Sequence, residues 1–581
     1  MKTLKHFSYI LVAALGMMFG GCSNILDLES LTEPNNEDFF SNEQELLLAL
    51  TGVYNTVYWV DGNNIPGPIM MDNGGTDIGV SRGISMGGFV ELGAGSQSSS
   101  TSWFATNYEQ FYKGIARANN LLNNMPRARE AMDENRYNQI RGEALSLRAY
   151  CYHFLTELYG DVPYTSQLAT SPDEALIPRM PKEQVADSML NDLQLAADFL
   201  PTTQSERGRF TKGAALALQA RIALYNSRFD VAASAARAAI ALEGEAGYSL
   251  YSNYEELFQP AGENAAEVMF VIPFKDGVRT QILTQLQGSR NVGGFGQLIP
   301  TQALVDSYEA TDGLPIDEST VYDPKRPFEN RDPRLQASII TPQSEWAGFI
   351  FESHPDSLTY RLVDGTVAGT NNDSRNISWP AAFCGYYWKK YTEEQAQRER
   401  RQWSDQDFIL LRYAEVLLTY AEATIEAGMI DGTTLNAINR VRARAYGVEV
   451  GETDKYPAIT TTDQTALRRI IRRERLVEFA NEGLRLFDIR RWRIAEKVMP
   501  QKIYGRLLDP SKATAAPDID EDGLISYTGL ESLYDFNPDS RFPNAQNRKF
   551  TNPRDYLLPI PQAEIDTYRA SGMELGQNEG Y

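Results

Sequence analysis

A serine between glycines is the first residue pattern with the spacing of a catalytic motif. Residues 83–87 read Gly-Ile-Ser-Met-Gly and match the GxSxG pattern around the nucleophile of many hydrolases. That nucleophile requires a strand before it, a helix after it and a histidine base. Here the pattern lies in a glycine-rich stretch, and His153 and His354 are the only histidines after residue 21. The sequence therefore favours a chance match over a hydrolase triad.

Three aspartates have the spacing of a calcium-binding loop. Asp518, Asp520 and Asp522 take the first three acidic positions of an EF-hand-like loop, followed by Gly523. The loop's last position, which needs a bidentate carboxylate, is a glycine, so Glu531 or another segment would have to replace it. The pattern predicts either a weak structural calcium site or an acidic surface turn. Nothing else in the sequence requires a cofactor.

Five arginines on one predicted helix could bind an anionic partner. Acidic residues follow them at spacings of three and four, however, which favours ion pairs within the fold. The arginines are Arg468, Arg469, Arg472, Arg473 and Arg475, and the acids are Glu474, Glu478, Glu482 and Asp488. We therefore expect a structural role for this cluster.

Two helical blocks would position these residues. Apolar residues recur at helical spacing in residues 42–242 and 407–498. Residues 60–104, 245–405 and 500–550 are rich in Gly, Pro and aromatic residues, and they predict irregular inserts with loops and short strands. The Ala-rich helices at 211–226 and 228–242 are similar to a tetratricopeptide pair. We predict one mainly α domain over residues 42–581.

The N-terminus has the pattern of a bacterial lipoprotein signal peptide. Lys2 and Lys5 precede an apolar run at 7–19, which is too short to span a bilayer of about 30 Å. Small residues and then Cys22 follow, as in a lipobox. We predict that residues 1–21 are removed and that lipid on Cys22 anchors the protein to a membrane. Residues 22–41 are polar and predict a tether.

Charge and cysteine content exclude several classes of partner. The formal net charge is −22, so nucleic acid would be repelled, and highly anionic polymers are disfavoured. After Cys22 only Cys151 and Cys384 remain, which excludes a disulfide framework. The body is therefore expected to be water-soluble and to disfavour strongly anionic ligands.

Several sequence blocks follow Cys22 in a fixed order. They lie at residues 141–163, 212–225, 411–423, 437–445, 474–492, 557–561 and 577–581. The most specific, at 474–492, reads ERLVEFANEGLRLFDIRRW. Together these blocks resemble the SusD/RagB family of nutrient-uptake outer-membrane lipoproteins of Bacteroidota. Glu579, where the family often has proline, is the one visible departure.

The resemblance implies a SusD-like helical frame with tetratricopeptide-like helix pairs and no catalysis. It implies a lipid-anchored protein on the outer face of the outer membrane, with a SusC-like TonB-dependent transporter as partner. The usual ligand is an oligo- or polysaccharide, and peptides are the ligands of the RagB-type branch. Glycan capture is the first hypothesis and peptide capture the alternative. A surface glycoside hydrolase is more distant, because no carboxylate pair is marked out.

Ligand residues of this family lie in inserts that do not align, so candidates are chosen by chemistry. Sugars stack their C–H faces on aromatic rings, while Asp, Asn and Arg bind their hydroxyls. In the first insert these rules select Asp72, Asp77, Arg82 and Trp103, and in the large insert they select Trp346, Trp379, Tyr386 and Trp388. We expect alanine at Trp103 or Trp388 to weaken binding without lowering thermal stability.

Overall fold

The described part of the chain begins just before the first helix. The structure is a computed structural model that describes residues 39–59, 64–82, 88–169, 171–378, 384–395, 399–535 and 548–581. The signal peptide, Cys22, the GxSxG pattern at 83–87 and Trp379 lie outside these residues. Predictions about them therefore stay predictions.

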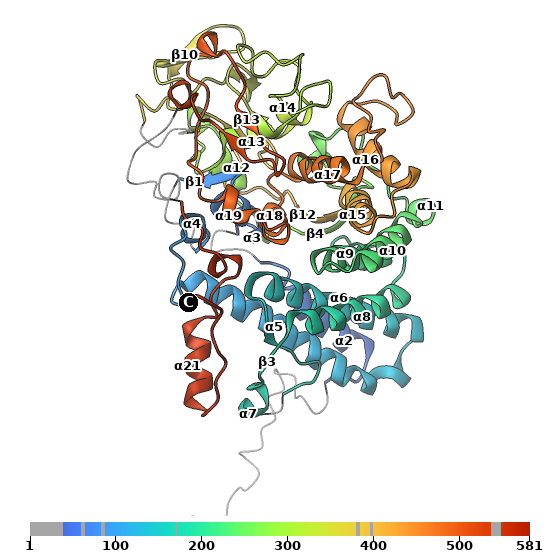
Figure 1. The fold of residues 1–581 in the computed structure, drawn as a ribbon. Helices are drawn as coiled ribbons and strands as arrows, with labels where there is room; N and C mark the ends of the chain where they lie inside the picture. Colours follow the sequence, from blue (N-terminus) through green and yellow to red (C-terminus); the bar gives the residue numbers. More distant parts are fainter. Residues whose placement is uncertain are drawn as a thin grey trace, which may run out of the picture.

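The first helical block is a row of helices that pack in sequence order (Figure 1). Polar side chains cap several of them: the Asp133 carboxylate accepts two backbone N–H groups in the first turn of α6, and the Thr211 hydroxyl accepts one in the first turn of α9. Alanines on α9 and α10 let these two helices approach closely. The block consists of α2 (Glu43–Tyr54), α5 (Ser102–Asn124), α6 (Glu134–Tyr159), α8 (Lys182–Phe199), α9 (Lys212–Tyr225) and α10 (Phe229–Ile240), with the short α7 (Pro172–Ala175) and α11 (Glu243–Ala246).

The second helical block continues this row. It consists of α15 (Tyr413–Glu426), α16 (Gly432–Ala445), α17 (Gln464–Glu478), α18 (Arg485–Arg491) and α19 (Ala495–Val498). Helix α15 packs on α10 and α9, and the buried Arg221 Nε donates to Glu415 at 2.6 Å. The mainly α frame predicted from the sequence is thus confirmed.

The large insert leaves and re-enters the frame at one antiparallel strand pair. Strand β4 (Val268–Ile272) pairs with β12 (Phe408–Arg412), with Phe408 opposite Ile272. In Figure 1 the insert lies in the upper part of the molecule, above the first helical block. Its elements are α12 (Leu283–Gln287), β5 (Leu298–Pro300), α13 (Gln302–Ser307), α14 (Arg334–Ser338), β6 (Ile339–Ile340), β7 (Glu345–Trp346), β8 (Phe349–Ile350), β9 (Thr359–Leu362), β10 (Val367–Thr370) and β11 (Tyr387–Trp388).

Residues 60–104 contain more regular structure than their composition indicates. They include α3 (Gly67–Gly75), β1 (Gly79–Ser81) and α4 (Gly88–Ala94). The glycines serve close packing: a Cβ on Gly93 would lie 2.1 Å from the Gly74 carbonyl oxygen. Strand β1 then pairs antiparallel with β5, with Val80 opposite Ile299. This pair joins the first insert to the large one.

Buried ion pairs join the second helical block to the insert. The Arg412 guanidinium contacts Glu267, Glu478 and Glu482, each at 2.7 Å. Arg334 contacts Glu478 from the insert side at 2.9 Å. On α17, Arg468, Arg472, Arg473 and Arg475 all pair with acids of the fold, as expected for a structural cluster.

The C-terminal region returns to the first block. It contains the hairpin β13 (Asp518–Ile519) and β14 (Ile525–Ser526), and then α21 (Gln562–Ala570). The Asn578 amide donates to the Tyr159 carbonyl oxygen at 2.9 Å, next to the small pair β2 (Val162–Pro163) and β3 (Arg179–Met180). Within the described residues, each helix is too short or too polar to cross a bilayer.

Candidate functional site

Two predicted ligand acids, Asp72 and Asp77, face the frame instead of solvent. Asp72 is fully buried and accepts the Gly483 backbone N–H at 2.7 Å. Burial raises the pKa of its carboxyl to about 7. Burial also raises the pKa of Asp77, but the ion pair with Arg485 at 2.7 Å outweighs it, and the pKa of Asp77 is lowered. Both acids anchor the first insert to α18 and the turn before it.

The predicted aromatic residues of the large insert that the structure describes belong to the core. Trp346, Tyr386 and Trp388 are each 1% exposed or less. Tyr386 donates to Gln302 Oε1, and the Trp388 indole N–H donates to Asn73 Oδ1, both at 2.6 Å. Their rings are covered in this conformation, so a ligand does not reach them without rearrangement.

Trp103 is intermediate in solvent exposure. Its ring packs edge-on against Phe89, with centroids 4.2 Å apart, and lies 6.1 Å from Trp59. The indole is half-buried against the main apolar core. Ligand contact at Trp103 stays a prediction.

Exposed aromatic rings are rare in the part of the chain that the structure describes. There, only Phe295 and Trp403 are exposed aromatics, with 40% and 57% of their surface accessible. Both lie in the large insert, one just before β5 and the other just before β12. They offer the uncovered ring faces that saccharide stacking requires.

A buried carboxylate holds the loop that carries Phe295. Asp373 accepts from the Ser289 hydroxyl at 2.6 Å, from the Arg290 backbone N–H at 2.9 Å and from the Tyr387 hydroxyl at 2.7 Å. Arg290 in turn donates to the Phe295 carbonyl oxygen at 3.2 Å. The ring is therefore presented on a fixed loop.

Arg401 connects the segment of Trp403 to the same loop. Its guanidinium lies against Gly293, where a Cβ would be 2.9 Å from Arg401 Cζ. Gly293 also has φ +87°, a backbone conformation that favours glycine. Ser404, next to Trp403, is held by backbone hydrogen bonds with Gln281 at 2.8 and 3.1 Å.

Arg82 is the predicted ligand residue that lies beside this loop. Its backbone N–H donates to the Gln297 carbonyl oxygen at 2.8 Å. Burial, and then the nearby Arg290 guanidinium, lower the pKa of Arg82. We define the aromatic surface as Arg82, Arg290, Phe295, Arg401 and Trp403. It combines two exposed rings with guanidinium donors, which suits the C–H faces and hydroxyls of a sugar.

The sequence selected Arg82 but missed Phe295 and Trp403. Phe295 stands in a glycine-rich loop, and Trp403 follows Arg400, Arg401 and Gln402 in a strongly polar run. A tryptophan in such a run has few apolar neighbours to pack against, and this was the available signal for its exposure.

The calcium prediction concerns the β13–β14 hairpin. Asp520 Oδ1 accepts the backbone N–H groups of Asp522 and Leu524 at 2.9 and 2.8 Å. Asp522 pairs with Arg472 at 3.1 Å and also with Lys497. Among the described residues, no three His, Cys, Asp or Glu side chains are grouped to hold a metal. Calcium binding here stays a prediction.

Comparisons with known proteins give a consistent family. The SusD family model matches residues 262–581, and a model described as "Starch-binding associating with outer membrane" matches residues 86–224. The chain is 25% identical over 560 residues to SusD-like protein P2 of Formosa agariphila, covering 94% of each protein. Over 331 residues it is 25% identical to the starch-binding protein SusD of Bacteroides thetaiotaomicron, covering 52% of this chain and 57% of that protein.

A solved structure agrees over nearly the whole chain. A SusD-like carbohydrate-binding protein from Bacteroides fragilis superposes with a TM-score of 0.75 at 27% identity, covering 91% of this chain and 99% of the other. The family model alone spans more than half of the sequence. The chain therefore belongs to the SusD family, whose members are binding proteins and not enzymes.

Proposed function

We propose that this protein captures glycan, as an oligo- or polysaccharide, at the aromatic surface. The observation that carries the proposal is the pair of exposed rings, Phe295 and Trp403, on loops held in place beside three arginines. A buried ring has no water-exposed surface left to contribute to binding. An exposed tryptophan contributes binding free energy when the face of a sugar removes its ring from water. The matched family and its starch-binding relative support the same ligand class.

The captured glycan would then pass to a transporter. We propose that lipid on Cys22 holds the protein on the outer face of the outer membrane, where a SusC-like TonB-dependent transporter takes up the ligand. The lipobox-like sequence before Cys22 and the outer-membrane description of the model matching residues 86–224 support this location. Protease treatment of intact cells tests it: cleavage of the wild-type body is expected, and full protection would contradict it.

Calorimetric titration of the mature chain, with Cys22→Ala to prevent lipidation, tests the ligand class. Neutral and acidic oligosaccharides and peptides are titrated in parallel. Saccharide binding is expected, and Trp403→Ala is expected to lower the affinity about tenfold, since the stacked ring contributes about 1.5 kcal/mol. Leu48→Ala is the control, because Leu48 is 62% exposed on α2, away from the insert.

The alternative ligand class is settled by the same titrations. Tight binding of peptides with no binding of any saccharide would replace glycan capture by peptide capture. Saccharide binding that is unchanged in both Trp403→Ala and Phe295→Ala would keep the ligand class but remove the aromatic surface as its site.

A further inference from the structure

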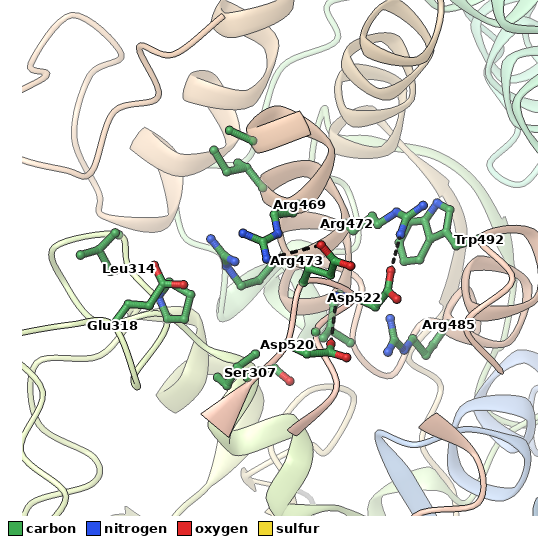
Figure 2. Close-up of a pocket in the computed structure, with 18 residues that line it drawn as sticks. Ser307, Leu314, Glu318, Arg469, Arg472, Arg473, Arg485, Trp492, Asp520 and Asp522 are labelled. Atoms are coloured by element: carbon green, nitrogen blue, oxygen red, sulfur yellow. Dashed lines mark hydrogen bonds and ion pairs between the residues drawn. The ribbon is translucent and has the colours of Figure 1, made fainter. Parts of the chain in front are cut away.

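A groove runs beneath the β13–β14 hairpin and is separate from the aromatic surface. It consists of two cavities of about 270 and 440 Å³, which share Ser307 and Gly523 in their walls. Helix α17 and the segment at 313–318 form the walls of the first cavity, and the segment at 498–504 lines the second. In Figure 2, Leu314 and Glu318 lie across the first cavity from Arg469 and Arg473.

Charged side chains of both signs line the first cavity. Its lining contains four arginines and four acids: Arg469, Arg472, Arg473, Arg485, Glu318, Asp520, Glu521 and Asp522. Arg473 and Arg485 are held in pairs with Glu309 and Asp77, at 2.6 and 2.7 Å. Such a lining offers both hydrogen-bond donors and acceptors, which suits a polyhydroxylated ligand.

Arg469 and Tyr504 are the groups best placed to contact a ligand there. The Arg469 side chain is 49% exposed, and its ion pair with Glu521 has a separation of 4.0 Å, so its guanidinium can turn to another acceptor at little cost. In the second cavity the half-buried Tyr504 ring is supported by Tyr527, with centroids 4.7 Å apart. Trp492 also lines the groove, but its ring faces Arg491 and Arg472 and its N–H donates to Glu422.

The strand pair β1–β5 connects the groove to the aromatic surface. Arg82 follows β1 at one end, and Asp77, which lines the second cavity, precedes it at the other. On the partner strand, Phe295 lies before β5, while Ala303 and Ser307 of the groove lie after it. Arg82 lies five positions after Asp77, and in extended chain this is a span of about 16 Å.

We propose that the groove is a second saccharide subsite, which takes a further, neutral segment of the same glycan chain that occupies the aromatic surface. The proposal rests on the proposed function, because it assumes that this surface binds glycan. A long chain then contacts both ends of β1, and a short one contacts the aromatic surface alone. Arg469 donates to the sugar hydroxyls, and Tyr504 provides the ring.

Affinity as a function of glycan length tests this subsite. A series of one bound oligosaccharide, from the shortest that binds upward, is titrated into wild type, Arg469→Ala and Tyr504→Ala. Each groove variant is expected to lose about fivefold in affinity for the long members, as for one hydrogen bond or ring contact, and nothing for the short ones. Trp403→Ala is expected to lose affinity for every length.

Matched variants separate this loss from effects on folding. Arg468→Ala changes the neighbouring arginine, which pairs with Glu426 outside the groove, and should bind every length as wild type does. Tyr504→Phe keeps the ring and should retain most of the affinity. Long-chain affinity equal to wild type in both Arg469→Ala and Tyr504→Ala overturns the subsite. So does a loss that is equal for all lengths, which would make the groove the primary site. If wild type binds no saccharide, the proposed function itself fails.

Discussion

The helical frame and the aromatic surface use the same residue types in opposite ways. In the frame, buried arginines pair with carboxylates, as Arg412 does with Glu267, Glu478 and Glu482. At the aromatic surface, Arg290 and Arg401 fix loop backbone, and the adjacent rings of Phe295 and Trp403 face solvent. Residue type therefore does not distinguish the proposed binding region from the frame, whereas exposure does.

The difference also has an energetic side. A buried charge that loses its partner carries a large desolvation penalty, whereas an exposed ring that is removed leaves the fold almost unchanged. Variants of the frame should therefore act on stability, and variants of the aromatic surface should act on binding.

The largest effect is expected at Glu478, where the frame and the insert meet. Burial raises the pKa of Glu478, but Arg444, Arg412 and Arg334 outweigh it and hold the pKa far below its ordinary value. Glu478→Gln removes the charge that these arginines share, and should lower the free energy of unfolding by about 3–5 kcal/mol in urea titrations. Glu426→Gln, which breaks the partly exposed pair with Arg468, should cost less than about 1 kcal/mol. Equal losses of stability in Glu478→Gln and Glu426→Gln would contradict the distinction between buried and partly exposed ion pairs.

Two tryptophans of the same insert give the next comparison. Trp388 is fully buried, and Trp388→Ala removes a core ring and the hydrogen bond to Asn73, so we expect a loss of about 3–5 kcal/mol in stability. The expectation from sequence, that this variant spares thermal stability, is not supported by this placement. Trp403→Ala should change stability by less than about 0.5 kcal/mol and should act on saccharide affinity. Thermal unfolding of both variants measures the contrast.

The helices could be predicted from sequence because their signals are local. Apolar spacing and the polar caps at Asp133, Thr211 and Asp463 indicate them directly. The exposed aromatic residues could not be predicted in the same way, because exposure depends on contacts with segments distant in the chain. Trp388, for example, is buried and donates a hydrogen bond to Asn73. The prediction of a loop at α3 and α4 was wrong for the same reason. Their glycine content indicates a loop, but in the fold these glycines allow neighbouring segments to pack closely.

The first insert provides a pH-dependent comparison between two acids. Asp72 has a pKa of about 7 in the folded protein against an ordinary 3.8, so the folded state binds this proton more tightly than the unfolded state does. The stabilisation from this protonated carboxyl is present at low pH and is lost as the pH rises toward 7. The stability of Asp72→Asn relative to wild type should therefore rise by about 1 kcal/mol per pH unit between pH 5 and 6.

Asp77→Asn is the matched control for that measurement. The pKa of Asp77 is lowered, so its contribution is complete above pH 4 and disappears only in more acidic solution. The difference between Asp77→Asn and wild type should therefore stay constant between pH 5 and 6. A slope for Asp77 equal to that for Asp72 would show that the effect does not come from these carboxyls.

The smallest effect is expected for calcium at the β13–β14 hairpin. Arg472 and Lys497 already neutralise Asp522, and Asp520 already accepts two backbone N–H groups, so a calcium ion must displace these contacts. Millimolar calcium should shift the thermal midpoint of wild type by less than about 1 °C, because weak binding adds little to stability. In Arg472→Ala the Asp522 carboxylate loses one competitor, and the shift should grow. A large shift in wild type that chelation reverses and Asp520→Asn abolishes would instead establish a structural calcium site, and would add a metal to the hairpin that covers the groove.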